Sequence, residues 1–217
     1  MDLEALYRHR FDEDDLPAKL AIWNVLCEDF FSKFITSTDT VIDVGAGYCE
    51  FINNVKCKRR IAIDLNPRLK DFASSEVEIR NESCTNLTSI ADGIADVVFM
   101  SNFLEHLPSK QLVLDTLVES KRILRAGGKL IILQPNVRFL PGAYWDFFDH
   151  HTPLTERSLV EAVTSIDLEP ILVIAKFLPY TTKSVLPQSP WLVRLYLKFP
   201  LAWKVLGKQS LVVAEKK

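Results

Sequence analysis

The stretch that decides the fold reads VIDVGAGYCE and spans residues 41–50. Three β-branched apolar residues surround Asp43, and Gly45 and Gly47 follow one residue apart. An apolar run that ends in glycines is typical of a buried strand and a tight loop, because glycine lets the backbone turn sharply and approach a ligand closely. The stretch therefore predicts the first strand of a sheet and, after it, a loop that binds a small molecule.

The spacing of these glycines argues against a bound diphosphate. A dinucleotide-binding loop reads G-x-G-x-x-G, and its third glycine would fall where this chain has Glu50. A carboxylate at the start of the next helix would repel a pyrophosphate, so a ligand that carries an amine fits this loop better. A P-loop is excluded because no Gly-Lys-Ser/Thr follows. A nicotinamide-dependent oxidoreductase stays open as an alternative, and NAD binding would reveal it.

Apolar runs alternate with helical segments along most of the chain. Continuous apolar runs are typical of a parallel sheet that helices cover on both faces. The pattern predicts a long amphipathic helix over 17–35, a helix within 108–128 that stops at Gly127, and a helix that begins near Thr155. One α/β domain over 1–217 is expected, with an N-terminal helical cap over 1–36. The expected strands cover 40–45, 60–65, 76–80, 95–101, 128–135, 171–177 and 209–216.

Two carboxylates accompany the glycine loop. Asp64 ends the second predicted strand, nineteen residues after Gly45, where a carboxylate accepts the hydroxyls of a ribose. Asp43 precedes the glycines, where it can order the loop or reach a ligand ammonium group through water. The sequence therefore predicts a nucleoside ligand that is held without a pyrophosphate.

Four motifs in this order resemble those of the class I S-adenosylmethionine-dependent methyltransferases, especially the small-molecule branch called methyltransferase type 11 or type 12. They are VIDVGAGYCEF, IAIDLNP, ADVVFMSNFLEHL and LRAGGKLIILQPN, and together they span about residues 39–135. The resemblance implies S-adenosylmethionine as the cofactor. It also implies a doubly wound, Rossmann-like sheet of seven strands in the order 3-2-1-4-5-7-6, with the last strand antiparallel.

The resemblance also implies which residues bind the cofactor. Gly45, Ala46 and Gly47 would face its methionyl part, Asp64 would hold the ribose, and the segment after the fourth strand would line the sulfonium end. The chain departs from the family pattern at Cys49, which stands where relatives often have a third glycine, and in the NESCTNL segment of residues 81–87. The cofactor-binding residues that we expect are Asp43, Gly45, Ala46, Gly47, Asp64, Leu65, Asn66, Ser83, Cys84, Asn102, Phe103 and His106. His106 either lines the site or only packs and caps.

The segment YWDFFDHHTPLTERSL, residues 144–159, follows the fifth predicted strand on the ligand side. Imidazole titrates near neutral pH, so His150 or His151 is a candidate general base. Adjacent side chains in an extended segment point opposite ways, so at most one of the two should face the substrate. In the alternative interpretation one histidine caps the helix near Thr155 and the aromatic residues are core. No metal site is expected, because adjacent residues such as these histidines beside Asp149 rarely chelate one ion well.

Residues 178–209 form an insertion where the family usually has a short hairpin. The insertion is rich in apolar and aromatic residues with interspersed Lys and Arg, which suits a peripheral membrane or lipid contact through 186–206. The alternative is a lid or dimer face that buries these aromatic residues against protein.

The composition narrows the class of function. The net charge is −2, so nucleic-acid binding is not expected. From Lys183 onward the chain has seven of the 26 Lys and Arg but only one of the 28 acids. The part of the chain before Lys183 is therefore acidic. The four cysteines lack metal-ligand spacing, and no signal-like or membrane-spanning run occurs. We therefore expect a cytoplasmic protein with reduced thiols, and a membrane-peripheral location stays open as an alternative. The expected function is methyl transfer to a small molecule such as a sugar or a lipid-linked biosynthetic intermediate. A module that binds the cofactor as a partner or sensor, without turnover, is the alternative.

Overall fold

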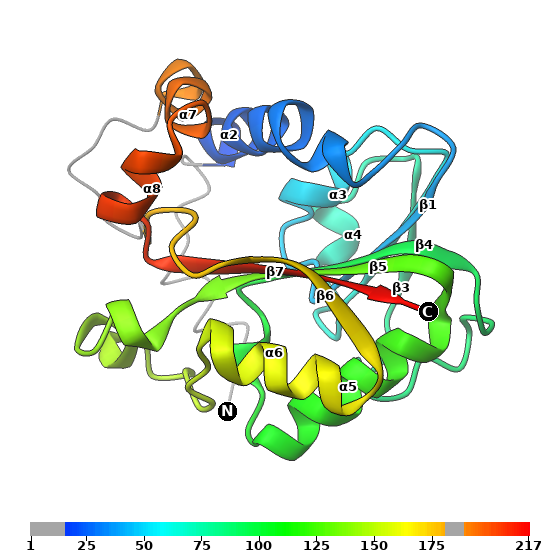
Figure 1. The fold of residues 1–217 in the computed structure, drawn as a ribbon. Coiled ribbons are helices and arrows are strands. Elements are labelled where there is room, and N and C mark those ends of the chain that lie inside the picture. The colour runs from blue at the N-terminus through cyan, green and yellow to red at the C-terminus, as the bar shows by residue number, and fades with distance from the viewer. Residues whose placement is uncertain (1–15, 181–188) are drawn as a thin grey trace.

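A computed structural model describes residues 16–180 and 189–217 of the chain, and its centre is one twisted sheet (Figure 1). The strand order is β3-β2-β1-β4-β5-β7-β6, and β7 runs antiparallel to both of its neighbours. The predicted order and the antiparallel last strand are thereby confirmed. The strands are β1 (Thr40–Val44), β2 (Arg59–Ile63), β3 (Val77–Arg80), β4 (Ala95–Ser101), β5 (Leu124–Pro135), β6 (Leu168–Ile174) and β7 (Gln209–Lys216).

Helices cover both faces of this sheet, as the continuous apolar strands require. On one face lie α2 (Leu16–Asp29), α3 (Glu50–Asn54), α4 (Leu69–Phe72), α7 (Pro190–Leu197) and α8 (Pro200–Leu206), and on the other α5 (Lys110–Ile123) and α6 (Glu156–Ser165) (Figure 1). Neighbouring strand residues alternate between the two cores: Phe99 packs toward α2 and α3, whereas Val98 packs toward α5 and α6. The central strands are therefore buried on both sides.

The parallel strands bring their following loops together at one edge of the sheet. The backbone N–H of Gly45, after β1, donates to the carbonyl of Ile63 at the end of β2 (2.9 Å). The N–H of Asn102, after β4, donates to the carbonyl of Leu133 in β5 (2.9 Å). The loops after β1, β2, β4 and β5 are thus neighbours, and the ligand side of the sheet is this edge.

The N-terminal helix is shorter than predicted and is not one-sided. α2 ends at Asp29, and a 3₁₀ turn over Phe31–Lys33 follows, because Phe30 and Phe31 both enter the core. Val25, Leu26 and Cys27 are consecutive yet all buried, which one helical face cannot achieve. α3 and α7 flank α2, so the expected amphipathic helix over 17–35 was wrong in both length and pattern. Residues 1–15 of the expected cap lie outside the described residues.

Two further element boundaries differ from the prediction. The helix within 108–128 ends at Ile123, and Gly127 lies inside β5 with a φ of +72° instead of acting as the helix stop. β6 occupies 168–174 instead of 171–177, because it follows the pairing partner β7 and passes Pro170 at an irregular position of this edge strand. α6 begins near Thr155, as predicted, and Thr155 itself caps the helix instead of a histidine: the Thr155 hydroxyl accepts a hydrogen bond from the N–H of Ser158 at 3.1 Å.

The described part of the insertion forms α7 and α8 between β6 and β7. Val193 and Trp203 pack against the core on the α2 side. The Arg194 guanidinium contacts the carboxylates of Glu28 (3.0 Å) and Asp29 (3.1 Å), which joins α7 to α2. Within residues 16–180 and 189–217, no helix combines the length and apolar character needed to cross a membrane.

Candidate active site

The glycine loop after β1 adopts a conformation that side chains disfavour. Gly45 and Gly47 have φ angles of +73° and +51°, and Cys49, the residue before α3, has a φ of +60°. Gly45 is also sterically fixed: a Cβ there would lie 2.3 Å from Cγ and Cδ2 of Phe103. The loop therefore lies against the segment that follows β4, so two of the expected binding segments meet.

Asp64 holds the glycine loop from the end of β2. Its Oδ2 accepts the N–H of Gly47 (2.9 Å), and its Oδ1 accepts the N–H of Asn66 (2.8 Å). Leu65, between Asp64 and Asn66, is 64% exposed. An exposed leucine beside a half-buried carboxylate presents an apolar surface and a hydrogen-bond acceptor to the same space.

The floor of this loop is acidic. Asp43 is buried, and burial, followed by the nearby charges of Glu50 and Asp64, raises its pKa well above the ordinary value. Burial also raises the pKa of Glu50, which begins α3. Three carboxyl groups around one loop disfavour a diphosphate, and a cationic ligand would favour their ionised forms.

The segment after β3 contributes two different environments. The Ser83 hydroxyl pairs with that of Thr85 (3.0 Å) in a half-buried turn. Cys84 packs against the core on the α5 side, and its sulfur accepts the hydroxyl of Thr116 (3.2 Å). Burial raises the pKa of the Cys84 thiol.

The segment after β4 carries Asn102 and His106 to the ligand edge. Asn102 is exposed and has a φ of +47°. The Nδ1 atom of His106 lies 3.1 Å from Oδ2 of Asp149, a residue 43 positions later. Burial alone would lower the pKa of His106, but the Asp149 hydrogen bond and the Glu105 charge outweigh it and the pKa is raised.

The two adjacent histidines lie in different environments. His150 is buried, its Nδ1 donates to the carbonyl of Tyr144 (2.8 Å), and its ring lies 5.0 Å from that of His106. His151 is exposed, and its backbone N–H donates to the carbonyl of Glu105 (2.9 Å). The structure thus separates the two side chains, and it brings both residues beside the segment that follows β4.

Glu105 lies in the segment that was expected to line the sulfonium end, but no separate role was expected for its side chain. Its side chain is 1% exposed, and burial raises its pKa to about 7, although the charge of His106 opposes the shift. Neither of its carboxylate oxygens has a hydrogen-bond partner among the residues that the structure describes. The only sequence signal was its place in the LEHL motif, next to His106.

Asn136 and Glu156 were also missed, and they fix the loop that carries the histidines. The Asn136 amide donates to Oε2 of Glu156 (2.6 Å) and to the carbonyl of Ala175 (3.0 Å). Arg138 pairs with the other carboxylate oxygen of Glu156. The end of β5 is thereby tied to the first turn of α6.

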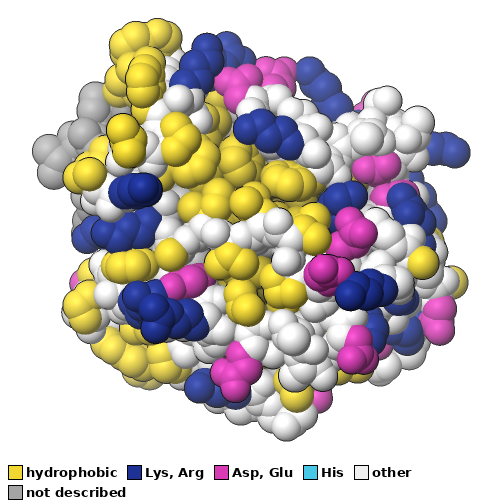
Figure 2. All heavy atoms as spheres, viewed as in Figure 1, with side chains coloured by type: hydrophobic (Ala, Val, Ile, Leu, Met, Phe, Trp, Pro, Cys, Tyr) yellow, Lys and Arg dark blue, Asp and Glu magenta, His cyan; other side chains and the backbone are white. Residues whose placement is uncertain are grey.

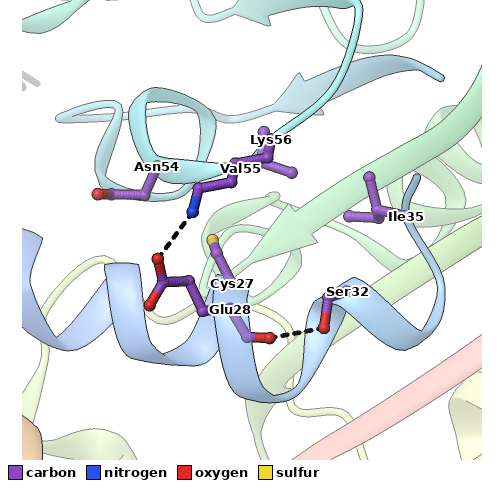
Figure 3. Close-up of a pocket in the computed structure, with 7 residues that line it drawn as sticks. All are labelled: Cys27, Glu28, Ser32, Ile35, Asn54, Val55 and Lys56. Atoms are coloured by element: carbon purple, nitrogen blue, oxygen red, sulfur yellow. Dashed lines mark hydrogen bonds and ion pairs between the residues drawn. The ribbon is translucent and has the colours of Figure 1, made fainter. Parts of the chain in front are cut away.

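A separate hollow of about 290 Å³ lies between α2 and the end of α3 (Figure 3). Cys27, Glu28 and Ser32 line it from the α2 side, and Lys56 extends across it to Glu28 (2.8 Å; Figure 3). The hollow adjoins the last residues of α3, whereas the glycine loop adjoins the first. None of the expected binding residues lines it, so it is distinct from the candidate active site.

The seven-stranded order with an antiparallel last strand, combined with a glycine loop and an aspartate at the end of β2, is the arrangement of class I methyltransferases. Residues 42–132 match a family model described as a methyltransferase domain. The matched part of the chain is similar to a methyltransferase domain, and the strand order is the one that the resemblance to class I S-adenosylmethionine-dependent methyltransferases implied. No curated protein matches the sequence.

Solved structures share this fold at low sequence identity. An S-adenosylmethionine-dependent methyltransferase from Archaeoglobus fulgidus is 15% identical, with 100% of both chains covered and a TM-score of 0.68. A Thermotoga maritima methyltransferase, for which histamine is the suggested acceptor, is 16% identical over 98% of this chain and 99% of that one, with a TM-score of 0.70. Geranyl diphosphate C-methyltransferase from Streptomyces coelicolor, in complex with Mg²⁺, geranyl diphosphate and S-adenosyl-L-homocysteine, is 15% identical over 87% of this chain and 78% of that one, with a TM-score of 0.60. An amine and a diphosphate ester are chemically unlike, so the shared fold does not specify the acceptor.

Proposed function

We propose that this chain transfers the methyl group of S-adenosylmethionine to a small-molecule acceptor of the sugar or lipid-linked class. The observation that carries the proposal is the Asp64 carboxylate, which bridges Gly47 and Asn66 beside the acidic glycine loop. A ribose needs a fixed acceptor, and a cationic ligand is favoured by nearby carboxyl groups. The residues present therefore fit a sulfonium nucleoside.

In this proposal each binding segment has its own part of the cofactor. Asp64 accepts from the ribose, and Leu65 and Asn66 flank the adenine together with Ser83 and Cys84. Gly45, Ala46 and Gly47 approach the methionyl part closely because the loop lacks bulky side chains. Asp43 lies beneath the loop, where a bound cationic group would favour the ionised form of its buried carboxyl. Asn102, Phe103 and His106 line the other side.

The chain contributes to the reaction mainly by positioning. The bound cofactor supplies a methyl group on a positively charged sulfur, which is already activated for transfer. The residues of the glycine loop and of the segment after β4 hold the reactants in fixed places and exclude water. Alignment of this kind lowers barriers by roughly 7–11 kcal/mol in well-oriented reactions.

An acceptor hydroxyl also needs a group that takes its proton, and we assign this role to His151 over His150. The His151 side chain is exposed at the ligand edge, whereas His150 is buried among His106, Tyr144 and Phe147. A general base must reach the acceptor and titrate near neutral pH. His151→Asn should lower kcat, while the affinity for the cofactor stays unchanged.

A lipid-linked acceptor is favoured by the exposed surface of the insertion. Trp191, Leu201 and Val205 are 67%, 75% and 76% exposed, and apolar side chains gather at α7 and α8 in Figure 2. Lys198 and Lys204 lie among them, and residues 189–208 contain no acid. Exposed apolar side chains next to basic ones match the boundary of an anionic membrane.

Cosedimentation with vesicles tests this surface. Vesicles of phosphatidylcholine with phosphatidylserine should bind the protein, and pure phosphatidylcholine should bind it less. The double variant Leu201→Glu, Val205→Glu should lose binding, whereas Val118→Glu, on the 48% exposed Val118 of α5, is the matched control and should keep it. Absence of binding to both kinds of vesicle would contradict the lipid contact. A dimer in light scattering that the double variant dissociates would assign the surface to a second copy of the chain.

Transfer of label tests the main proposal against a module that only binds. The protein would be incubated with S-adenosylmethionine carrying a labelled methyl group and with sugar and lipid fractions of a cell extract. Label should accumulate in a small molecule, and Asp64→Asn should slow the transfer when the cofactor is not saturating. Saturable binding without transfer to any fraction would instead favour the sensor module.

A further inference from the structure

Three potential metal ligands converge between the segment after β4 and the loop before α6. Glu105 and His106 belong to the 3₁₀ turn Leu104–His106, and His150 comes from the other loop. One carboxylate oxygen and one ring nitrogen of each histidine all lie within 4.8 Å of one another. Two imidazoles and a carboxylate are a common ligand set for a divalent transition metal.

In each of the two histidines, one ring nitrogen contacts an oxygen atom of a neighbouring residue, as is common for metal-binding histidines. Nδ1 of His106 lies 3.1 Å from the Asp149 carboxylate, and Nδ1 of His150 donates to the Tyr144 carbonyl at 2.8 Å. A metal-binding histidine typically donates its other ring N–H to a carboxylate or a backbone carbonyl, which fixes the ring and its tautomer. The Tyr144 hydroxyl in turn donates to the Thr152 carbonyl (2.6 Å), so this loop is anchored from within.

Glu105 supplies the observation that points to a ligand. Its side chain is 1% exposed and both carboxylate oxygens lack a hydrogen-bond partner among the described residues. Burial of a polar group without a partner costs free energy, and a cation next to the carboxylate removes that cost. Two negative carboxylates, Glu105 and Asp149, would also balance the two positive charges of a divalent ion.

We infer that Glu105, His106 and His150 bind one divalent transition-metal ion such as Zn²⁺, which joins the segment after β4 to the loop before α6. Imidazole ligands favour Zn²⁺ over Mg²⁺ and Ca²⁺, which prefer oxygen ligands. Ligands about 2.1 Å from an ion lie at most about 4.2 Å apart, so binding draws the three groups slightly together. The inference does not depend on the methyl acceptor. The proposed site differs from the expectation of no metal site. That expectation considered only adjacent residues, whereas the proposed ligands come from segments up to 45 positions apart.

Metal analysis of the full, untagged chain tests the site without an activity assay. The protein would be stripped with a chelator, exposed separately to Zn²⁺ and Mg²⁺, desalted, and analysed by mass spectrometry and thermal unfolding. We expect one Zn²⁺ per chain, a higher melting temperature with Zn²⁺, and neither effect with Mg²⁺. Retention of no Zn²⁺ would overturn the inference, and the failure of methyl transfer alone would not.

Variants identify the ligands. Glu105→Gln, of nearly equal shape, and His150→Asn should each lose the bound ion. His151→Asn is the matched control, because His151 is exposed and outside the cluster, and it should retain the ion. Equal loss in all three variants would overturn the assignment.

Cobalt substitution of the unmutated protein covers the case in which a variant fails to fold. Co²⁺ bound to two imidazoles and a carboxylate at a site of low coordination number gives visible absorption bands, whereas Co²⁺ in water absorbs weakly. Excess Zn²⁺ should remove the bands by displacement. A spectrum of hydrated Co²⁺ alone would contradict the proposed site.

Discussion

Gly45 and Gly47 lie in the same loop but are constrained differently. At Gly47 a Cβ would meet nothing within 4 Å, so Gly47→Ala should cost only the backbone penalty of a positive φ, about 1–2 kcal/mol. At Gly45 the same penalty applies, and the new Cβ would also lie 2.3 Å from the Phe103 ring. Gly45→Ala should therefore destabilise the protein more than Gly47→Ala, as measured by urea unfolding. Equal losses would mean that the Phe103 contact does not constrain the loop.

Asp64 fixes two backbone N–H groups with its two oxygens. Asp64→Asn replaces one oxygen by an NH₂ donor, so either Gly47 or Asn66 loses its acceptor. Hydrogen bonds to charged groups contribute about 1.5–3 kcal/mol, so the affinity for S-adenosylhomocysteine should fall about 10- to 100-fold. Calorimetry would measure this, with Asp71→Asn in α4 as a control. Unchanged affinity would exclude Asp64 from the binding site.

Asp43 should make the stability of the ligand-free protein depend on pH. Its pKa is raised by burial and then by Glu50 and Asp64, so the folded state keeps a proton that the unfolded state loses above about pH 4. The free energy of unfolding should therefore fall as the pH rises from that value toward the raised pKa. Asp43→Asn should show a shallower fall, with the residual slope due to Glu50. Parallel pH curves for the two proteins would contradict this account.

At the scale of elements, the tie between β5 and α6 positions the loop of the histidines. Asn136→Ala removes the amide that donates to the buried Glu156 carboxylate. Loss of one partner of a buried polar pair costs about 1–3 kcal/mol, so thermal unfolding should occur at a distinctly lower temperature. Asn86→Ala, at an exposed side chain, is the control and should change stability little. Equal effects of the two substitutions would show that the tie does not stabilise the loop.

The strands could be predicted well because their apolar runs are continuous. β4 and β7 were predicted to the residue, since each contains an apolar run that is buried on both faces. α2 and β6 were misplaced because tertiary contacts set their ends: Phe30 and Phe31 turn into the core, and β7 fixes the register of β6.

The residues of the candidate site also differ in how well they could be predicted, because some depend on local sequence and others on long-range contacts. Gly45, Gly47 and Asp64 could be recognised from local spacing, because the loop and the end of β2 follow a short motif. The contact between His106 and Asp149 could not be recognised, because it joins residues 43 positions apart whose proximity depends on the whole sheet. Glu105 gave no signal of burial, since glutamate is usually exposed.

At the scale of the whole molecule, the N-terminal helix and the insertion share one aromatic cluster. Phe30 lies 4.4 Å from Phe177 and 6.0 Å from Trp203 between ring centroids. Phe30→Ala should cost about 3–5 kcal/mol and should speed proteolysis within α8 as well as α2. Arg194→Ala, which removes only exposed ion pairs, should cost less than about 1 kcal/mol. If Phe30→Ala left α8 protected, the two regions would be independent.

The positions of the four tryptophans give this molecule built-in fluorescent reporters of two kinds. Trp23 and Trp203 lie in the aromatic packing on the α2 side, whereas Trp145 and Trp191 project into solvent. Unfolding would hydrate the first pair and move their emission to longer wavelength. Insertion of Trp191 of α7 into lipid would move its emission to shorter wavelength. Opposite shifts of the emission wavelength would thus distinguish a protein that adsorbs to a vesicle from one that denatures on it.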